Sequence, residues 1–150
     1  MASDLTTTIT ESVTLNGSVR GSTNTTTQTS VVDVLERIVT CTQSQTTTVA
    51  VFAANPYTSA GAIDVDRTKY IRITNLSTTE DIEVASVGSA TLYQVKLRAG
   101  YSHVLSEGAE ILLAEADTTP SFGTMESLAS IQVKPTASTD VQCEIFVGLV

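Results

Sequence analysis

The chain is poor in the residues that most enzymes and nucleic-acid-binding proteins need. Its 150 residues include no tryptophan, one histidine and two cysteines, and only 8 lysines and arginines against 16 aspartates and glutamates. The formal net charge of -8 argues against a phosphate-backbone partner, which requires clustered cations. No apolar run approaches the ~20 residues that span a bilayer, and no basic segment followed by an apolar one marks a secretory signal. We therefore expect a soluble protein, made in a cytoplasm, that binds neither nucleic acid nor a membrane.

Few side chains offer catalysis or metal binding. His103 is the sole histidine, and without a Gly-x-Ser-x-Gly motif a surface or satisfied histidine is favoured over a general base acting with Glu107. Cys41 and Cys143 lack CxxC spacing and a nearby histidine, so we interpret both as reduced structural thiols. We expect no enzymatic activity, no cofactor and no metal.

Two acidic clusters and two aromatics leave alternatives open. The carboxylates at 80, 81 and 83, and those at 64 and 66, could bind a hard cation such as calcium or solvate turns; they lack the spacing of a calcium loop, which favours solvated turns. Tyr57 and Phe122 lie in loop-like segments, where exposed aromatics could bind sugars. Packing in a core or an interface is the favoured interpretation for both.

Threonine and serine are abundant, and at the amino terminus they alternate with apolar residues. A period of two is typical of a strand with one buried face. The apolar set, which we expect to face a core, is Leu5, Ile9, Val13 and Leu15. The hydroxyl set, which we expect to face a partner, is Thr6, Thr8, Thr10, Ser12 and Thr14. Asn16-Gly17 predicts a turn, and residues 18–30 predict a long loop or an extended edge segment.

Short strands account for most of the remaining chain. The apolar residues of 31–42 have some helical spacing, but the β-branched content of this segment favours a strand. We expect a further strand over residues 46–54. We expect hairpins from segments 69–76 with 81–88 and from 128–135 with 140–150, and short strands in 101–108 and 109–116. Two segments alternate strictly between apolar and polar residues. In residues 93–100 the inward set would be Tyr93, Val95, Leu97 and Ala99. In the last strand it would be Val141, Cys143, Ile145, Val147 and Leu149. Together these patterns predict an all-β fold, a jelly-roll-like β-sandwich of about 8–10 strands.

Four segments carry a resemblance to a known class. In the order TITESVTLNGSVRGSTNT, LERIVTC, KYIRITNLSTTEDIEV and LRAGYSHVLSEG, the chain resembles small virion structural proteins of tailed bacteriophages, particularly marine and cyanobacterial phages. The resemblance implies an all-β subunit located on the virion, without an active site.

The residue patterns and the resemblance together predict a capsid decoration, or cement, protein. It would be a homotrimer that binds between subunits of the major capsid protein; the alternatives are a tail, neck or fibre-base protein and a carbohydrate-binding module for host attachment. Residues 1–30 would form an arm against a neighbouring subunit, and residues 31–150 the sandwich core. The candidate contact residues are Thr6, Thr8, Thr10, Thr14, Arg20, Thr25, Thr27, Tyr57 and Phe122.

Overall fold

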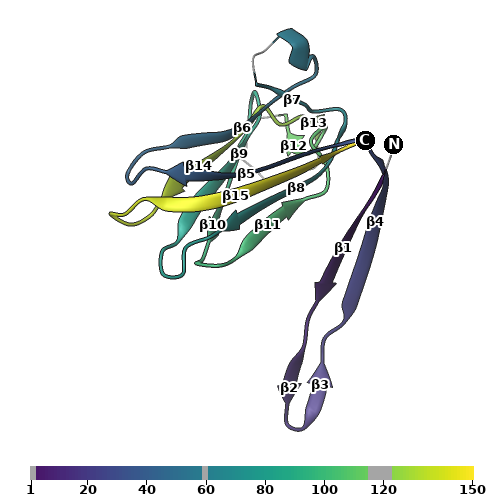
Figure 1. Cartoon of the computed structure of the whole chain (residues 1–150), viewed down its shortest axis with the longest axis vertical. Helices are drawn as coiled ribbons and strands as arrows, with labels where there is room; N and C mark the ends of the chain where they lie inside the picture. Colours follow the sequence, from purple (N-terminus) through teal and green to yellow (C-terminus); the bar gives the residue numbers. More distant parts are fainter. Residues whose placement is uncertain (1–2, 59–60, 115–122) are drawn as a thin grey trace.

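The computed structural model describes residues 3–58, 61–114 and 123–150, and within them the chain forms a two-sheet β-sandwich with a projecting β-arm (Figure 1). Sheet I has the order β10 (Leu92–Leu97), β9 (Ile82–Val87), β14 (Ser130–Pro135), β6 (Thr47–Ala53) and β7 (Ile63–Asp64). Sheet II has the order β11 (Ser102–Leu105), β8 (Thr68–Asn75), β15 (Val141–Leu149) and β5 (Asp33–Cys41). The arm contains β1 (Ser3–Thr10), β2 (Val13–Leu15), β3 (Ser18–Arg20) and β4 (Thr23–Val31). The predicted all-β sandwich is confirmed.

Smaller elements complete the described structure. A 3₁₀ turn, η1 (Pro56–Thr58), follows β6, and β12 (Leu112–Leu113) pairs with β13 (Met125–Glu126). Of the predicted strand at 109–116, only Leu112–Leu113 is a strand, and residues 115–116 lie outside the described residues. In the described part of the chain, no helix has the length and apolarity needed to cross a membrane.

Strand pairing in the sandwich is nested. β5 pairs with β15, β6 with β14, β8 with β11, and β9 with β10, all antiparallel. Moving along the chain away from the β9–β10 hairpin in both directions, the strands pair in turn. β8 pairs with β11, then β6 with β14, and then β5 with β15. Most sequential strands consequently lie in opposite sheets.

Two predicted hairpins are therefore wrong. β8 and β9 are consecutive, but β8 lies in sheet II between β11 and β15, whereas β9 lies in sheet I. Likewise β14 belongs to sheet I and β15 to sheet II. The turn-like residues between these strands carry the chain across the edge of the sandwich instead of closing a hairpin.

The core is formed by the facing surfaces of the two sheets. The prediction for the last strand is confirmed, because its five alternate residues are all buried: Val141, Cys143, Ile145, Val147 and Leu149. Ile71 and Ile73 of β8 meet Ile82 and Val84 of β9 in the same cluster. Alternate β-branched residues suit this position because they pack well on a pleated surface.

Burial decreases along the edge strand β10. Leu97 is buried and Val95 is half-buried, as the alternation predicts, and Ala99 is half-buried just beyond the strand. Tyr93 is 45% exposed, although its ring lies 6.0 Å from that of His103 in the opposite sheet. It faces the other sheet but sits at the open rim, so its predicted inward position is only half correct.

Candidate assembly site

The arm is a two-stranded ribbon made of two successive ladders, β1 with β4 and β2 with β3. Partner residues keep one register from Leu5↔Gln28, through Thr10↔Thr23, to Leu15↔Ser18. The predicted turn closes it, with φ of 49° at Asn16 and 79° at Gly17, as a type I′ hairpin turn requires. At about 3.3 Å per residue the ribbon extends roughly 35–40 Å. Residues 18–30 thus form the extended segment, not the long loop.

A close backbone approach interrupts the ribbon between its outer and inner parts. The Glu11 amide donates to the Ser22 carbonyl at 2.9 Å. A Cβ placed on Gly21 would lie 2.0 Å from the Glu11 carbonyl oxygen, and Gly21 has φ of 127°. Glycine is therefore required here, because any side chain would push the two strands apart.

One face of the arm is covered with hydroxyl groups. Thr8 and Thr25 are joined through their Oγ1 atoms at 3.1 Å, and Thr10 and Thr23 at 3.2 Å. Of the candidate contact residues, seven lie on the arm and are exposed: Thr6, Thr8, Thr10, Thr14, Arg20, Thr25 and Thr27. Six of them share the hydroxyl face, whereas Arg20 is paired with Val13 and lies on the other face.

The apolar face of the arm is not part of the core, which corrects the prediction for Leu5, Ile9, Val13 and Leu15. Ile9 is 52% exposed, Val13 49% and Leu15 55%, and Leu5 alone is half-buried. The alternation is real, but the ribbon leaves the sandwich after its first residues (Figure 1). These side chains therefore form an uncovered apolar stripe along the arm.

The base of the arm is anchored on the outer face of sheet II. A Cβ added at Gly148 would lie 3.2 Å from Leu5 Cδ2, so Leu5 packs directly over this bare position of β15. The Val32 amide donates to the Leu149 carbonyl at 2.9 Å, and Val31 is buried. Where the arm diverges it leaves a wedge-shaped cavity of about 310 Å³ between β1 and Tyr70, Arg72 and Phe146.

Sheet II presents a mixed apolar and charged outer face beside this wedge. Tyr70 packs edge-on against Phe146, with ring centroids 5.9 Å apart, and Arg72 lies over the same ring. Arg72 also pairs with Glu144 at 2.8 Å, which holds the pKa of that carboxyl below its usual range. On the adjacent edge strand β5, Val34 is 45% and Ile38 61% exposed.

The other two candidate contacts are not brought to the arm. Tyr57 is 96% exposed in η1, in the loop between β6 and β7, which rises at the end of the molecule away from β2 and β3 (Figure 1). Its exposure excludes packing in this chain's core, and packing in an interface with another molecule stays a prediction. Phe122 lies outside the described residues.

Two of the acidic residues singled out above, Asp64 and Asp81, accept hydrogen bonds from backbone amides. Asp81 binds Lys96 at 3.1 Å and accepts the Ala99 amide, and the Lys96 contact lowers its pKa. Asp64 accepts the amides of Asp66 and Arg67. Across residues 3–58, 61–114 and 123–150, no group of three His, Cys, Asp or Glu is placed to hold a metal.

Glu126 is a structural carboxylate that the sequence patterns do not reveal. It accepts the Ser89 hydroxyl at 2.5 Å and the amides of Ser89, Ala90 and Thr91, and these bonds lower its pKa, the Ser89 hydroxyl most of all. A residue on β13 thereby fixes the turn of the β9–β10 hairpin. Its partner turn is 35 or more residues away in sequence, so no local motif indicates it.

His103 and the two cysteines are placed by packing. His103 Nε2 is buried and lacks a hydrogen-bond partner among the described residues, and burial lowers its pKa. Cys41 and Cys143 are free, fully buried thiols with sulfurs 3.6 Å apart on neighbouring strands. The contact with Cys41 and then burial raise the pKa of Cys143, which opposes formation of a reactive thiolate.

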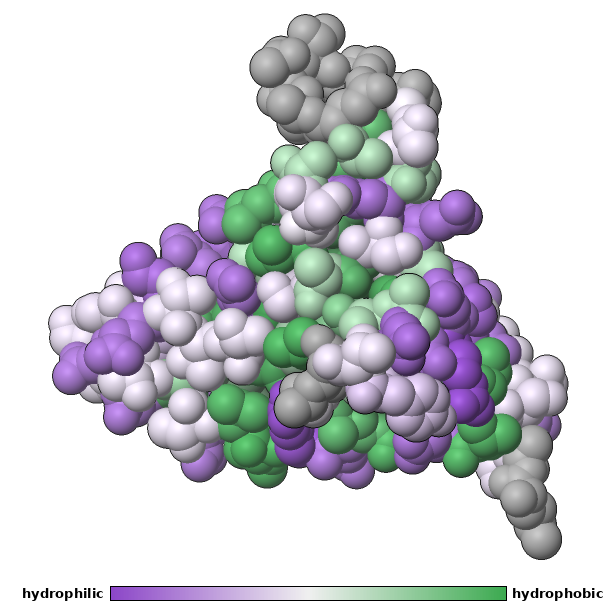
Figure 2. All heavy atoms as spheres, turned by 90° about the horizontal axis from the view of Figure 1, so that it is seen from above, coloured by the Kyte–Doolittle hydropathy of each residue, from purple (hydrophilic) through white to green (hydrophobic). Residues whose placement is uncertain are grey.

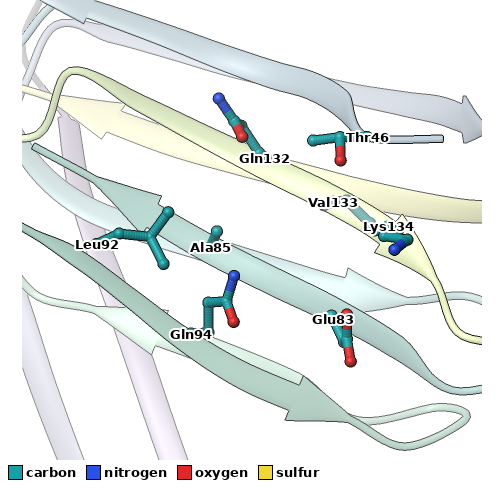
Figure 3. A pocket seen from close by; sticks show the side chains of 8 residues that line it. All are labelled: Thr46, Glu83, Ala85, Leu92, Gln94, Gln132, Val133 and Lys134. Atoms are coloured by element: carbon teal, nitrogen blue, oxygen red, sulfur yellow. The ribbon is translucent and has the colours of Figure 1, made fainter.

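The outer face of sheet I carries a small hollow. Figure 3 shows its lining side chains on β9, β10 and β14, with Thr46 beyond them, around a volume of about 70 Å³. Ligand pockets usually exceed about 300 Å³. From above, hydrophobic residues reach the surface as separate groups between hydrophilic ones (Figure 2).

The arm and the outer face of sheet II are therefore the surfaces best suited to contact another molecule. They place an uncovered apolar stripe, a hydroxyl-rich face and an exposed edge strand on one side of the sandwich. Comparison with protein-family models, with curated proteins and with solved structures finds no match for this chain, so its function must be argued from this geometry.

Proposed function

We propose that this chain is a non-enzymatic virion structural protein of a tailed bacteriophage, and that it is a capsid decoration protein. The observation that carries the proposal is the projecting arm, with Ile9, Val13 and Leu15 about half exposed. A two-stranded ribbon alone in water is marginally stable at best. An arm of this length is therefore expected to be completed by contact with another subunit.

The strand order supports a jelly-roll assignment for the sandwich. Taking its eight main strands in chain order, the sheets read 6-3-8-1 and 5-4-7-2, with the nested pairs described above. We propose that the fold is a jelly roll, an architecture used by viral capsid domains and also by lectins. The fold alone does not determine function, so the arm carries the functional argument.

The acidic composition fits a position outside the packaged nucleic acid. Net charge of -8 would be repelled by DNA on an inner surface. The arm itself carries only Asp4, Glu11 and Arg20 as charged residues between 3 and 31, so it can approach a protein surface with little repulsion. We propose that the threonine face of the arm binds the major capsid protein, whose many copies would multiply a weak contact.

Particle occupancy tests the proposal. Purified particles would be examined by quantitative mass spectrometry, with the wild-type chain and a chain in which residues 5–28 are replaced by a short Gly-Ser linker. We expect wild-type copies in numbers comparable with the major capsid protein, and loss of binding without the arm. A few copies per particle would instead favour the tail, neck or fibre-base alternative, and unchanged occupancy without the arm would refute its role.

One observation favours the carbohydrate-binding alternative. Tyr57 stands at a cavity of about 320 Å³ that also includes Asp64 and Arg67, and an exposed aromatic beside paired polar groups is suited to a sugar ring. A glycan array would test it, with Tyr57→Ala as the control. Absence of binding, or binding that Tyr57→Ala leaves unchanged, would remove this alternative.

A further inference from the structure

The apolar stripe of the arm and the outer face of sheet II are complementary surfaces within one chain. The stripe begins at Leu5, which already packs on Gly148 of that face in its own subunit. The following stripe residues continue beyond the reach of their own sheet, as the divergence of the arm shows (Figure 1). The same sheet face thus accepts the first residue of the stripe and leaves the rest uncovered.

The outward side of β5, at the edge of sheet II, also exposes apolar residues at alternate positions. Val34 and Ile38 alternate with Glu36 on the outward side of this edge strand, and both are more than two-fifths exposed. Apolar residues at alternate positions on two extended surfaces can interdigitate when the surfaces are laid together. Arg37 points inward and donates to the Val49 carbonyl of β6, and an inward charge of this kind discourages edge-to-edge pairing. Contact through the face is therefore favoured over extension of the sheet.

Charge specifies how the two surfaces would meet. On the outer face, Glu36 lies beside Glu144, and Arg72 forms its ion pair with Glu144. This group contains two carboxylates and one guanidinium, so one negative charge is left over. The arm contains a single cation, Arg20, which lies opposite Val13 and shares the apolar face with the carboxylate of Glu11, between Ile9 and Val13 in the alternation. Arg20 is therefore the group of the arm that can pair with the surplus carboxylate at Glu36.

We propose that the apolar face of the arm in one copy covers the outer face of sheet II in a second copy. Ile9, Val13 and Leu15 would pack on Val34 and Ile38, and Arg20 would pair with Glu36. Because arm and sheet face are different surfaces, the contact closes either as a reciprocal exchange between two copies or as a ring of more copies. The homotrimer expected from the sequence is one such ring. The inference rests on the proposed role of the arm but identifies its partner as this chain itself.

Charge reversal in solution tests the contact without any particle. Sedimentation velocity over a concentration series would compare the wild type with Arg20→Glu, Glu36→Arg and the double variant. We expect each single variant to weaken self-association at least about tenfold, and the double variant to recover most of it, because the pair is re-formed with opposite signs. Self-association should also weaken as salt is raised.

Matched controls separate this contact from net charge. Lys134→Glu and Glu83→Arg make the same charge changes at paired, exposed positions on sheet I, and they should leave association unchanged. Circular dichroism would verify that all variants fold. A monomeric wild type, single variants without effect, or a double variant without recovery would overturn the inference. Because particle occupancy is measured separately, either proposal can fail while the other stands.

Discussion

Leu5 of the arm lies directly over Gly148 of β15, so that a Cβ at Gly148 would come within 3.2 Å of Leu5 Cδ2. This contact joins the arm to the sandwich at a position where an added side chain would crowd Leu5. Gly148→Leu should displace the arm base, since an added side chain must push Leu5 away. We expect faster amide hydrogen exchange in β1 and β4, while β5 and β15 stay protected. Leu5→Ala combined with Gly148→Leu should restore the room and slow exchange again, and unchanged exchange in Gly148→Leu alone would contradict this packing.

The apolar stripe should contribute little to the stability of the isolated subunit. Ile9→Ser and Val13→Ser at about half-exposed positions should change the free energy of unfolding of the monomer by at most about 0.5 kcal/mol. Ile145→Ala, at a fully buried position, should cost about 2–5 kcal/mol. Urea denaturation under monomeric conditions measures the difference. A large loss at Ile9 would mean that the stripe is buried within the subunit.

Gly21 should be more sensitive to substitution than Gly17. Both have positive φ, but a Cβ at Gly21 meets the Glu11 carbonyl, whereas one at Gly17 meets nothing within 4 Å. Gly21→Ala should separate the strands of the arm, and Gly17→Ala should only strain its turn. Two-dimensional NMR would then show larger shifts around residues 10–13 and 20–23 in Gly21→Ala. Equal perturbation by the two variants would argue against the close approach.

The two thiols should be unreactive in the folded protein. Both are fully buried, and the reacting species is the thiolate, which the contact with Cys41 and then burial disfavour at Cys143. Titration with Ellman's reagent should detect no rapid reaction until denaturant is added, and two thiols afterwards. Thr10→Cys, at an exposed arm position, provides the positive control. Rapid modification of the native wild type would show that the sandwich opens at β5 and β15.

Stability should fall in acid. The Arg72 contact lowers the folded-state pKa of Glu144, and the Lys96 and Ser89 contacts lower those of Asp81 and Glu126. A carboxyl whose folded pKa is depressed stabilises the fold above its unfolded pKa, about 4, and loses this contribution as pH falls through the folded value. Thermal unfolding at pH 7 and pH 3 should show the loss. Glu126→Gln should reduce the difference, and an identical difference would contradict a role for Glu126.

How much of the fold can be predicted from the sequence depends on what an alternation of apolar and polar residues can indicate. Period-two patterns locate β8, β10 and β15 and the buried side of β15, because side chains on a pleated strand alternate between faces, whereas β-branched content indicates β5. They cannot report pairing partners, since β8 and β9 are adjacent in sequence but separated into opposite sheets. Local turn residues look the same whether the chain reverses within a sheet or crosses between sheets.

The arm shows a second limit of the same reasoning. Ile9 and Val13 have the pattern of core residues, and the structure exposes them. A strand that packs on the core of its own chain and a strand that packs on another molecule need the same alternation. The pattern therefore predicts that one face of the strand is buried, but it does not indicate which molecule covers that face. The hydroxyl-face candidates were identifiable from sequence, whereas Val34, Glu36 and Ile38 required the pairing of β5 to show which side faces outward.

The nested pairing of the sandwich also bears on how the protein folds as it is synthesised. Only β9 and β10 form a hairpin within the sandwich, and β5 must wait for β15, which follows it by roughly a hundred residues and lies between β5 and β8. Such high contact order makes folding slow, because distant segments must meet before most contacts form. The pairings within the arm are closer in sequence, but a two-stranded ribbon alone in water is marginally stable at best, and its base packs on β15. The arm therefore becomes ordered only when sheet II is complete, and assembly between copies follows folding of the whole sandwich.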